Sequence, residues 1–484
     1  MADEIQLKEL EEIRKMGFDP YPYKFDRTHR INEVIEKYSK IKPGEKIENV
    51  KISVAGRIKS KRHHGKLSFA HIEDFSGSIQ AFVGADNVSE KEYELLSKLN
   101  IGDIIGVEGG IIKTVKGELS ILVKKLTLLS KAVRTLPSQW YGLKDVEIRY
   151  RQRYLDLIMN EESRKIFVMR TNIISAIREF LDSKGFIEVE TPILQPIYGG
   201  AAAKPFKTML NELKMEVFLR TADELYLKRL IVGGFDAVYE ISKDFRNESI
   251  DMKHNPEFTM LELYKSYLDY NGIMDLFEEM VSFVAKKVLG TTKIEYQGHK
   301  IDLSKWERLP IIDAIKKYLN EDVSKMDLEK LRKTAGKLKI EISDEITKGE
   351  IIAALFESFD KKIIEPTFIT DYPKETTPLC KLKRGNPDFI ERFEPFACGL
   401  ELGNAYSELN DPIEQKKLLE EQVKIRKKVE EPWTEALDED FIRALEYGMP
   451  PLGGLGVGID RLVMLFTNTA SIKDVILFPF MKPE

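Results

Sequence analysis

A short run of alternating side chains at residues 258–264 constrains the fold of this chain more than any other stretch. The run reads FTMLELY, so Phe258, Met260, Glu262 and Tyr264 alternate with Thr259, Leu261 and Leu263. A period of two is typical of a β-strand, because successive side chains of a strand point to opposite faces. One face of this strand therefore carries an aromatic ring, a carboxylate and a phenol.

A second strand is predicted just before it. Residues 237–242, AVYEIS, have strand propensity, and the segment between the two runs is rich in Asn, Asp, Ser, His and Pro. The sequence thus predicts a hairpin with a long polar loop. Arg246 and Glu262 can form an ordinary cross-strand ion pair in such a hairpin. The density of polar groups favours a binding site instead, since an arginine near the ring of Phe258 suits a nucleoside triphosphate.

Between residues 50 and 129 the chain changes to short strand-like runs separated by turns. About five such runs, with glycines at the joints and a helical stretch at 88–99, are typical of a small closed barrel of the OB type. Residues 51–135 contain fourteen Lys and Arg against nine Asp and Glu, whereas the whole chain has a net charge of −5. Attraction for nucleic acid is therefore expected from the barrel.

Two rings of this barrel, Phe69 and Phe82, are candidates for stacking on single-stranded bases. A phenylalanine in a small barrel is more often a core residue, so both interpretations stay open. Gln80 lies two residues from Phe82 on the same face, and a polar neighbour favours binding.

A second polar centre is predicted in residues 392–412, RFEPFACGLELGNAYSELNDP. Asn404, Tyr406 and Glu408 alternate onto one strand face, with Glu394 and Glu401 nearby. Carboxylates gathered in one pocket repel one another unless cations neutralise them, and an ammonium group and Mg²⁺ would do so. Strict alternation places Glu401 on the face opposite Glu408, so a β-bulge near Gly403 is expected.

Residues 453–466, GGLGVGIDRLVMLF, are interpreted as a glycine-rich turn that leads into an apolar helix. Arg461 falls in the first turn of that helix. A guanidinium group and the helix dipole together favour the binding of an anion there.

These segments resemble the three ordered motifs of the class II aminoacyl-tRNA synthetases, in the form found in lysyl-tRNA synthetases. GFIEVETP at 185–192 resembles motif 1, FRNE with HNPEFTMLE resembles motif 2, and GGLGVGIDRL resembles motif 3. The resemblance covers nearly the whole chain. It implies an α+β protein with an N-terminal OB-fold β-barrel, followed by a class II catalytic domain built on an antiparallel β-sheet flanked by helices. The expected parts are a helical lead (1–48), an anticodon-binding barrel (49–135) and a catalytic domain (136–484) with a helical insertion (301–362).

The same resemblance implies roles for individual residues, with Arg246 and Arg461 as the catalytic groups. ATP binding is implied for Arg246, Glu248, His254, Asn255, Phe258, Glu394, Glu401, Gly458 and Arg461. Lysine binding is implied for Gly200, Glu224, Arg246, Glu262, Tyr264, Asn404, Tyr406 and Glu408. Glu394 and Glu401 would hold Mg²⁺. Anticodon binding is implied for Lys61, Arg62, Phe69, Gln80 and Glu118.

The implied activity is that of a lysine–tRNA ligase, with ATP, L-lysine and tRNA(Lys) as substrates and a homodimer formed through motif 1. Asp223, Ser249 and Cys398 depart from the residues usual in the family, which has proline at the position of Asp223. Two alternatives remain: a paralogue that lysylates something other than tRNA, and a non-catalytic RNA-binding protein with a degenerate synthetase body. Such paralogues tend to lack the barrel.

Location and cysteine chemistry follow from composition. No apolar run approaches the ~18 residues of a membrane helix, and the charged N-terminus lacks the apolar core of a signal peptide, so a cytoplasmic protein is expected. Cys380 and Cys398 cannot build a disulfide framework, and their spacing is not that of a zinc site.

Overall fold

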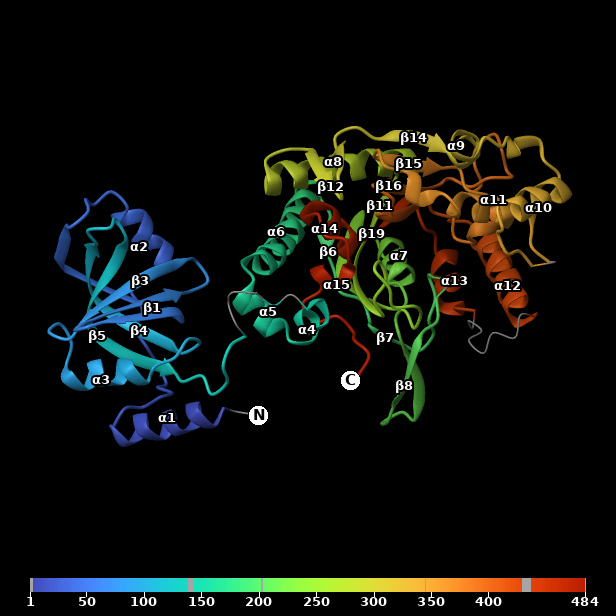
Figure 1. Ribbon diagram of the computed structural model, residues 1–484. Helices are drawn as coiled ribbons and strands as arrows, with labels where there is room; N and C mark the ends of the chain where they lie inside the picture. The colour runs from blue at the N-terminus through green and yellow to red at the C-terminus, as the bar shows by residue number, and fades with distance from the viewer. Residues whose placement is uncertain are drawn as a thin grey trace. The chain divides into compact units, whose positions relative to one another are not determined.

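The computed structural model describes residues 3–137, 143, 145–201, 203–343, 345–428 and 437–483, with the backbone alone for 425–428. The chain divides into two compact units, residues 1–144 and residues 145–484 (Figure 1). We call them the barrel unit and the sheet unit. The predicted fold class, an OB-type barrel followed by a mainly antiparallel sheet with flanking helices, is confirmed.

The barrel unit closes five strands in the order β1-β2-β3-β5-β4. The strands are β1 (Lys46–His64), β2 (Leu67–Glu73), β3 (Ser78–Gly84), β4 (Ile104–Lys113) and β5 (Leu119–Ser130). Helix α3 (Glu90–Lys98) connects β3 to β4, as the sequence predicts, and a capping box at Ser89 and Glu92 begins it. Alternating Val and Ile side chains from the strands fill the interior.

The helical lead belongs to this unit. Helices α1 (Glu4–Lys15) and α2 (Ile31–Tyr38) bury Ile13, Ile31 and Val34 in the same apolar core as the strands. Strand β1 begins at Lys46, inside the range expected to be helical lead. The lead is therefore part of the barrel's core and not a separate domain.

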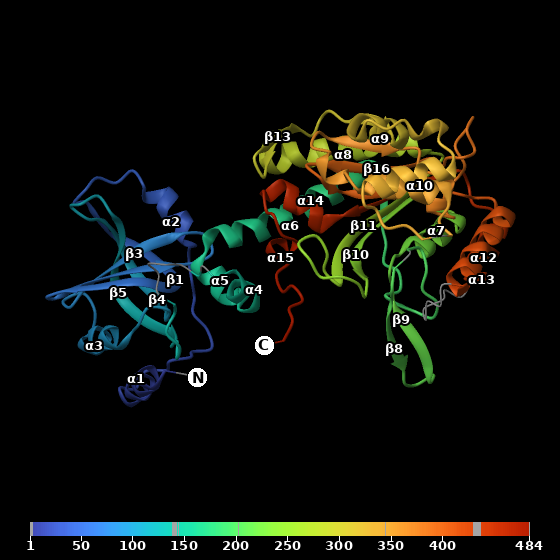
Figure 2. The same ribbon diagram turned by 45° about the vertical axis from the view of Figure 1, so that its right-hand side comes forward.

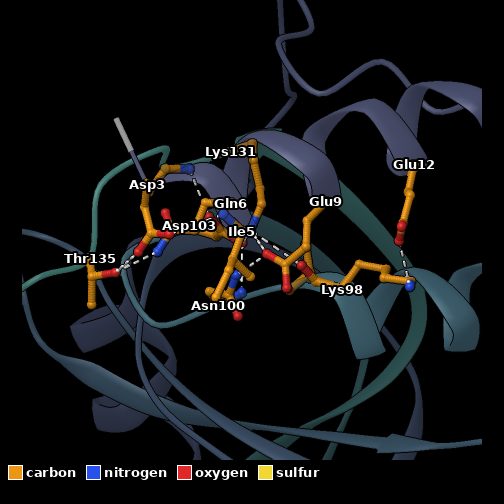
Figure 3. A network of polar contacts seen from close by, with 12 residues as sticks. Asp3, Ile5, Gln6, Glu9, Glu12, Lys98, Asn100, Asp103, Lys131 and Thr135 are labelled. Atoms are coloured by element: carbon orange, nitrogen blue, oxygen red, sulfur yellow. Dashed lines mark hydrogen bonds and ion pairs between the residues drawn. The ribbon is translucent and has the colours of Figure 1, made fainter. Parts of the chain in front are cut away.

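Polar contacts fix α1 to the barrel (Figure 3). Lys131 Nζ, which is fully buried, lies 3.0 Å from Asp103 and 3.2 Å from Glu9 of α1. Lys98 pairs with Glu12 at 2.7 Å, and Gln6 donates to Thr135 at 2.9 Å. The centre of this network is the buried Lys131–Asp103 pair, because Asp103 also accepts two backbone N–H groups.

The sheet unit is built on one large sheet with the order β14-β15-β16-β18-β19-β11-β10-β6, in which β17 pairs with β16. Its strands are β6 (Ile187–Glu188), β10 (Ala237–Phe245), β11 (Glu257–Ser266), β14 (Glu307–Pro310), β15 (Thr367–Thr370), β16 (Arg392–Ala397), β17 (Leu400–Glu401), β18 (Gly403–Ser407) and β19 (Leu452–Gly458). Neighbours are antiparallel except β10 with β6 and β14 with β15. Two small sheets complete the strands: β7 (Leu194–Gln195), β9 (Met215–Leu219) and β8 (Phe206–Leu210) in one, and β12 (Lys293–Tyr296) and β13 (His299–Asp302) in the other.

Long helices cover one face of the large sheet. Figures 1 and 2 show α6 (Glu161–Ser183), α8 (Tyr270–Leu289) and α14 (Ile459–Thr467) side by side, and they share one apolar core with Leu261, Leu263 and Val457 of the sheet. The other helices are α4 (Val146–Arg151), α5 (Arg153–Met159), α7 (Glu224–Val232), α9 (Ile311–Leu319), α10 (Leu328–Lys337), α11 (Lys348–Glu357), α12 (Pro412–Lys428), α13 (Glu439–Glu446) and α15 (Ile472–Val475), with 3₁₀ turns at Val323–Lys325, Asp360–Lys362 and Lys374–Thr376. None of the helices in the described part of the chain is long and apolar enough to cross a membrane.

Two segments differ from the sequence prediction. The range 301–362 contains β14 in addition to helices α9, α10 and α11, and β14 joins the edge of the large sheet. The prediction of a glycine-rich turn at residues 453–458 is wrong, because these residues form β19, a central strand between β18 and β11. Glycine is uncommon in strands, and the reason for it here lies in the functional site.

We predict that Lys131→Ala weakens the barrel unit by about 3–5 kcal/mol, since it leaves the buried Asp103 carboxylate without its cation. Amide hydrogen exchange of β4 and β5 in the whole chain measures this loss. Lys125→Ala is the control, because Lys125 and Glu108 form a surface pair with side chains 62% and 41% exposed, and its removal should cost less than about 1 kcal/mol. An equal loss of stability in the two variants would contradict a central role of the Lys131–Asp103 pair.

Candidate active site

The face of the large sheet opposite α6, α8 and α14 carries a cavity of about 680 Å³, and α12 contributes Leu419, Gln422 and Val423 to its lining. Every residue predicted to bind ATP, lysine or metal lines it. They are Gly200, Glu224, Arg246, Glu248, His254, Asn255, Phe258, Glu262, Tyr264, Glu394, Glu401, Asn404, Tyr406, Glu408, Gly458 and Arg461. Residues more than 250 positions apart in the sequence thus meet at one site.

The hairpin β10–β11 supplies the first group of these side chains. Phe258, Glu262 and Tyr264 all point into the cavity, as their alternation predicts. The register pairs Glu262 with Glu240, so the alternative of a cross-strand ion pair between Arg246 and Glu262 is wrong. Arg246 lies just beyond β10, where its guanidinium carbon is 5.1 Å from the centre of the Phe258 ring.

A β-bulge brings the second group onto the same face. Phe393 pairs with Ala405, but Phe396 pairs with Glu401, so one extra residue is inserted in the second strand near Leu402. This shift moves Glu401 to the face that carries Glu394 and Asn404. The bulge expected near Gly403 is confirmed.

Strand β19 forms the floor of the cavity between these two groups. A Cβ atom on Gly454 would lie 2.1 Å from Glu408 Oε1, and a Cβ on Gly456 would lie 2.6 Å from Glu262 Oε1. Both distances are shorter than any real contact allows. The glycines are therefore required because carboxylates from the neighbouring segments lie directly over the backbone of β19.

One end of the cavity is rich in carboxylates. Glu224, Glu262 and Glu408 line it and are all buried. Burial, with the nearby charges of Asp223 and Glu224, raises the pKa of Glu262 well above its usual range, while Tyr264 donates to its carboxylate at 3.0 Å. Burial also raises the pKa of Glu408 to about 8, although Lys228 opposes this shift. Such an environment favours a bound cation.

The other end is richer in arginine. Arg461, in the first turn of α14, donates to the backbone oxygen of Glu401 at 2.9 Å and lies 3.2 Å from its carboxylate. Its second nitrogen is 3.1 Å from His254 Nε2. Arg392 pairs with Glu394, whose pKa burial nevertheless raises to about 7. Guanidinium groups of this kind suit phosphate oxygens.

Glu394 and Glu401 have donor atoms that suit a metal ion. Both present carboxylate oxygens on one sheet face, which are the ligands that Mg²⁺ prefers. Among the described residues no group of three or more His, Cys, Asp and Glu is arranged to hold a metal ion. The pair fits a Mg²⁺ ion that takes its remaining ligands from substrate phosphates and water, as is usual for this ion.

Three cavity-associated cations were missed in the sequence. Arg392 contacts Glu394 and donates to Asn404 at 2.9 Å, Lys253 donates to the backbone oxygen of Gly399 at 2.7 Å, and Lys228 lies behind the carboxylate end. The period of two that identified Glu394 also applies to Arg392, and a spacing of one helical turn relates Lys228 to Glu224. Both signals were therefore present in the sequence.

The barrel unit has a polar patch of its own. Gln80 donates to Glu118 at 2.7 Å and accepts from Ser120 at 2.9 Å, and His71 Nε2 lies 2.6 Å from the other oxygen of Glu118. Phe69 and Phe82 are half-buried on the same face with ring centres 5.2 Å apart, and the register pairs Arg62 with Phe69.

Lys61 does not lie with this patch. It points to the opposite face of β1, where its ammonium group donates to the backbone oxygens of Leu96 and Leu99 at 3.1 and 2.5 Å. These are carbonyls at the C-terminal end of α3, which a cation satisfies well. Burial lowers the pKa of Lys61.

Comparisons with known proteins agree with this geometry. Residues 145–482 match the family described as tRNA synthetases class II (D, K and N), and residues 52–129 match the OB-fold nucleic acid binding domain. The lysine–tRNA ligase of Carboxydothermus hydrogenoformans is 51% identical over 99% of this chain and 98% of its own length. Those of Moorella thermoacetica and a Thermoanaerobacter species are 50% and 52% identical, over 99% of this chain and 97% and 96% of their own lengths. This chain is therefore a member of the class II tRNA synthetases, in the lysine–tRNA ligase family.

Proposed function

We propose that this chain is a lysine–tRNA ligase, which activates L-lysine with ATP and transfers it to the 3′ end of tRNA(Lys). The choice of lysine as the amino acid rests on the surroundings of Glu262. This carboxylate is buried in the cavity wall, and within the described residues its polar contact is the hydroxyl of Tyr264 and no cation of the chain. An ammonium group of the substrate would supply the missing charge, and an apolar amino acid would leave it unpaired.

The amino acid occupies the carboxylate end of the cavity in this proposal. Glu262 and Tyr264, with Asn404, Tyr406 and Glu408, bind the side chain of lysine, and Glu224 binds its α-ammonium group beside Gly200. Gly200 supports this placement, because its positive φ of 85° disfavours any other residue and a Cβ there would lie 3.4 Å from the Cβ of Glu224, so glycine lets the loop backbone lie next to Glu224. Glutamate or aspartate would be repelled by the same carboxylates.

ATP occupies the arginine end. Arg246 contacts both the α-phosphate and the carboxylate of lysine, Phe258 stacks on adenine, and Arg461 contacts the γ-phosphate. Glu248, His254, Asn255 and Gly458 complete the site. Arg461 would exchange its contact with Glu401 for phosphate oxygens when ATP binds. Mg²⁺ held by Glu394 and Glu401 would neutralise phosphate charge.

Two steps follow from this placement. The lysine carboxylate attacks the α-phosphorus of ATP, a new P–O bond forms, and pyrophosphate leaves. The 3′-hydroxyl of the tRNA ribose then attacks the carbonyl carbon of lysyl-adenylate, and AMP leaves. No cavity side chain is needed as a covalent nucleophile, so the residues act by positioning the reactants and by stabilising phosphoryl charge.

The anticodon of tRNA(Lys) binds to the barrel in this proposal. Phe69 stacks on a base, while Gln80 and Glu118 supply hydrogen bonds to base edges. Arg62 contacts phosphate. Lys61 does not contact the tRNA in this proposal, because its ammonium group donates to backbone oxygens at the end of α3 on the other face of β1.

A homodimer through the motif 1 region and a location in the cytoplasm complete the proposal. Apolar side chains that a monomer would leave in water support the dimer: Ile187, Ile193, Leu194 and Met209 are 50%, 43%, 51% and 55% exposed. Exposed apolar groups gathered in one segment are typical of a protein interface.

ATP–pyrophosphate exchange with each of the twenty amino acids, without tRNA, tests the activity. We expect exchange with lysine alone, and a loss of about 10²–10³-fold in the exchange rate for Arg246→Ala, the range typical of one electrostatic donor. Arg308→Ala is the control, because Arg308 pairs with Asp275 at a strand outside the cavity. Exchange with no amino acid would contradict the proposed function.

Phe69→Ala tests the anticodon site. Loss of a stacked base costs about 1–3 kcal/mol, so kcat/KM for tRNA(Lys) should fall about 5- to 150-fold, while exchange without tRNA stays unchanged. Phe75→Ala removes another barrel phenylalanine that is 73% exposed and should leave both activities unchanged. The same loss in both variants would rule out a specific role for Phe69.

Ile187→Arg tests the dimer, since a charged side chain on an exposed apolar position is tolerated by a monomer and disrupts an apolar interface. Light scattering should give twice the chain mass for the wild type and a shift toward the single-chain mass for Ile187→Arg. Val115→Arg, in a barrel turn where Val115 is 88% exposed, should remain dimeric. A wild-type chain that is monomeric at micromolar concentration would refute the dimer.

A further inference from the structure

A fully buried lysine lies directly behind the carboxylate end of the cavity. Lys228 follows Glu224 by one turn of α7, and its side chain is 0% exposed. Its ammonium group lies 2.5 Å from Glu224 Oε1 and 2.5 Å from Glu408 Oε2. Both partners line the cavity, whereas Lys228 itself does not. One cation therefore joins two carboxylates that come from segments 184 positions apart.

The carboxylate end of the cavity contains more acidic groups than cations. Three carboxylates, Glu224, Glu262 and Glu408, line it, and Lys228 is their one cation within the described residues. When all three carboxyl groups are ionised, the group is thus short of two positive charges. Lysine at neutral pH carries two ammonium groups, and its carboxylate is accounted for by Arg246 in the proposed function.

We propose that Lys228 is a positioning residue, which holds the carboxyl groups of Glu224 and Glu408 together and matches the charge of the occupied pocket to the two ammonium groups of lysine. This inference rests on the proposed function and adds a residue that touches neither substrate. Without Lys228, three carboxylates would face two ammonium groups, and the pocket would take up one proton more than the wild type does. The two ammonium groups of bound lysine favour the ionised form of all three carboxyl groups, so lysine would release that proton when it binds.

The surroundings of Lys228 support this role. Burial by itself lowers the pKa of an ammonium group, but Glu224 and Glu408 reverse the effect and raise the pKa of Lys228 above its ordinary value. The ammonium group also lies 5.8 Å from the centre of the Tyr264 ring. The titratable groups that face the cluster from neighbouring elements are Asp223, Glu262, Tyr264, Cys380 and Tyr406.

Lys228→Met removes the charge and keeps the length of the side chain. In ATP–pyrophosphate exchange we expect KM for lysine to rise at least about tenfold at pH 7, with KM for ATP within about twofold of the wild type. The ratio of variant to wild-type KM for lysine should narrow as the pH rises from 7 to 8.5, because the extra proton is lost as the pH rises. Taking the ratio cancels the titration of lysine itself.

A double variant, Lys228→Met with Glu408→Gln, separates charge from packing. It removes one cation and one carboxylate, so the pocket remains short of two positive charges. We expect its KM ratio for lysine to be independent of pH, even though the loss of Glu408 raises KM. At this position it leaves Glu224 without its cation, whereas the single variant leaves both Glu224 and Glu408 without one, so the double variant guards against failure of the single variant to fold. Lys131→Met, at an equally buried lysine of the barrel unit, should leave KM for lysine unchanged.

The possible outcomes are distinct. A pH-dependent ratio in Lys228→Met that disappears in the double variant supports the inference. An unchanged KM for lysine in Lys228→Met, or a raised KM whose ratio does not vary with pH, overturns it. A wild-type chain that shows no lysine-dependent exchange would instead overturn the proposed function itself.

Discussion

The structure of the sheet unit depends on how buried carboxylates are balanced by cations. Most of the acidic groups in the cavity have a cation from the chain, as Glu394 has Arg392, Glu401 has Arg461, and Glu224 and Glu408 share Lys228. Glu262 lacks one among the described residues. A buried charge without a partner is costly unless a ligand neutralises it. The unequal balance therefore points to the place where a cationic substrate binds.

Two backbone features make this arrangement of charges possible. The glycines of β19 leave the space in which Glu262 and Glu408 lie over a central strand. The bulge near Leu402 turns Glu401 to the face of Glu394, so that two acidic side chains from adjacent strands meet. Both features weaken a sheet locally, because glycine has no side chain to contribute and a bulge interrupts pairing. Their position at the cavity explains why they occur in the middle of the sheet.

Much of this site could be predicted from the sequence, because the chemistry lies on strands with a period of two. Alternation placed Phe258, Glu262 and Tyr264 on one face, and failure of alternation at Glu401 predicted the bulge. Other features could not be predicted in this way. Strand propensity is low for glycine, so the sequence of β19 predicts a turn. The sequence of α7 likewise gives no sign that Lys228 is buried, because its partner Glu408 lies on a distant segment. Lys61 shows the same limit, since only the packing of α3 reveals which carbonyls it contacts.

The departures from the family pattern leave the charge balance of the pocket intact. Asp223 is fully buried at the N-cap of α7, and burial with the nearby Asp244 raises its pKa well above its usual range, which favours its neutral form. Asp223 and Glu262 each disfavour the ionised form of the other, and Glu262 is the one that lines the cavity, so a bound ammonium group favours charge on Glu262 and the neutral form of Asp223. Cys398 forms a two-residue turn with Gly399, and burial raises the pKa of its thiol to about 11, so it is a poor nucleophile. A neutral acid and an inert thiol can thus stand next to this site without changing which amino acid its charges select.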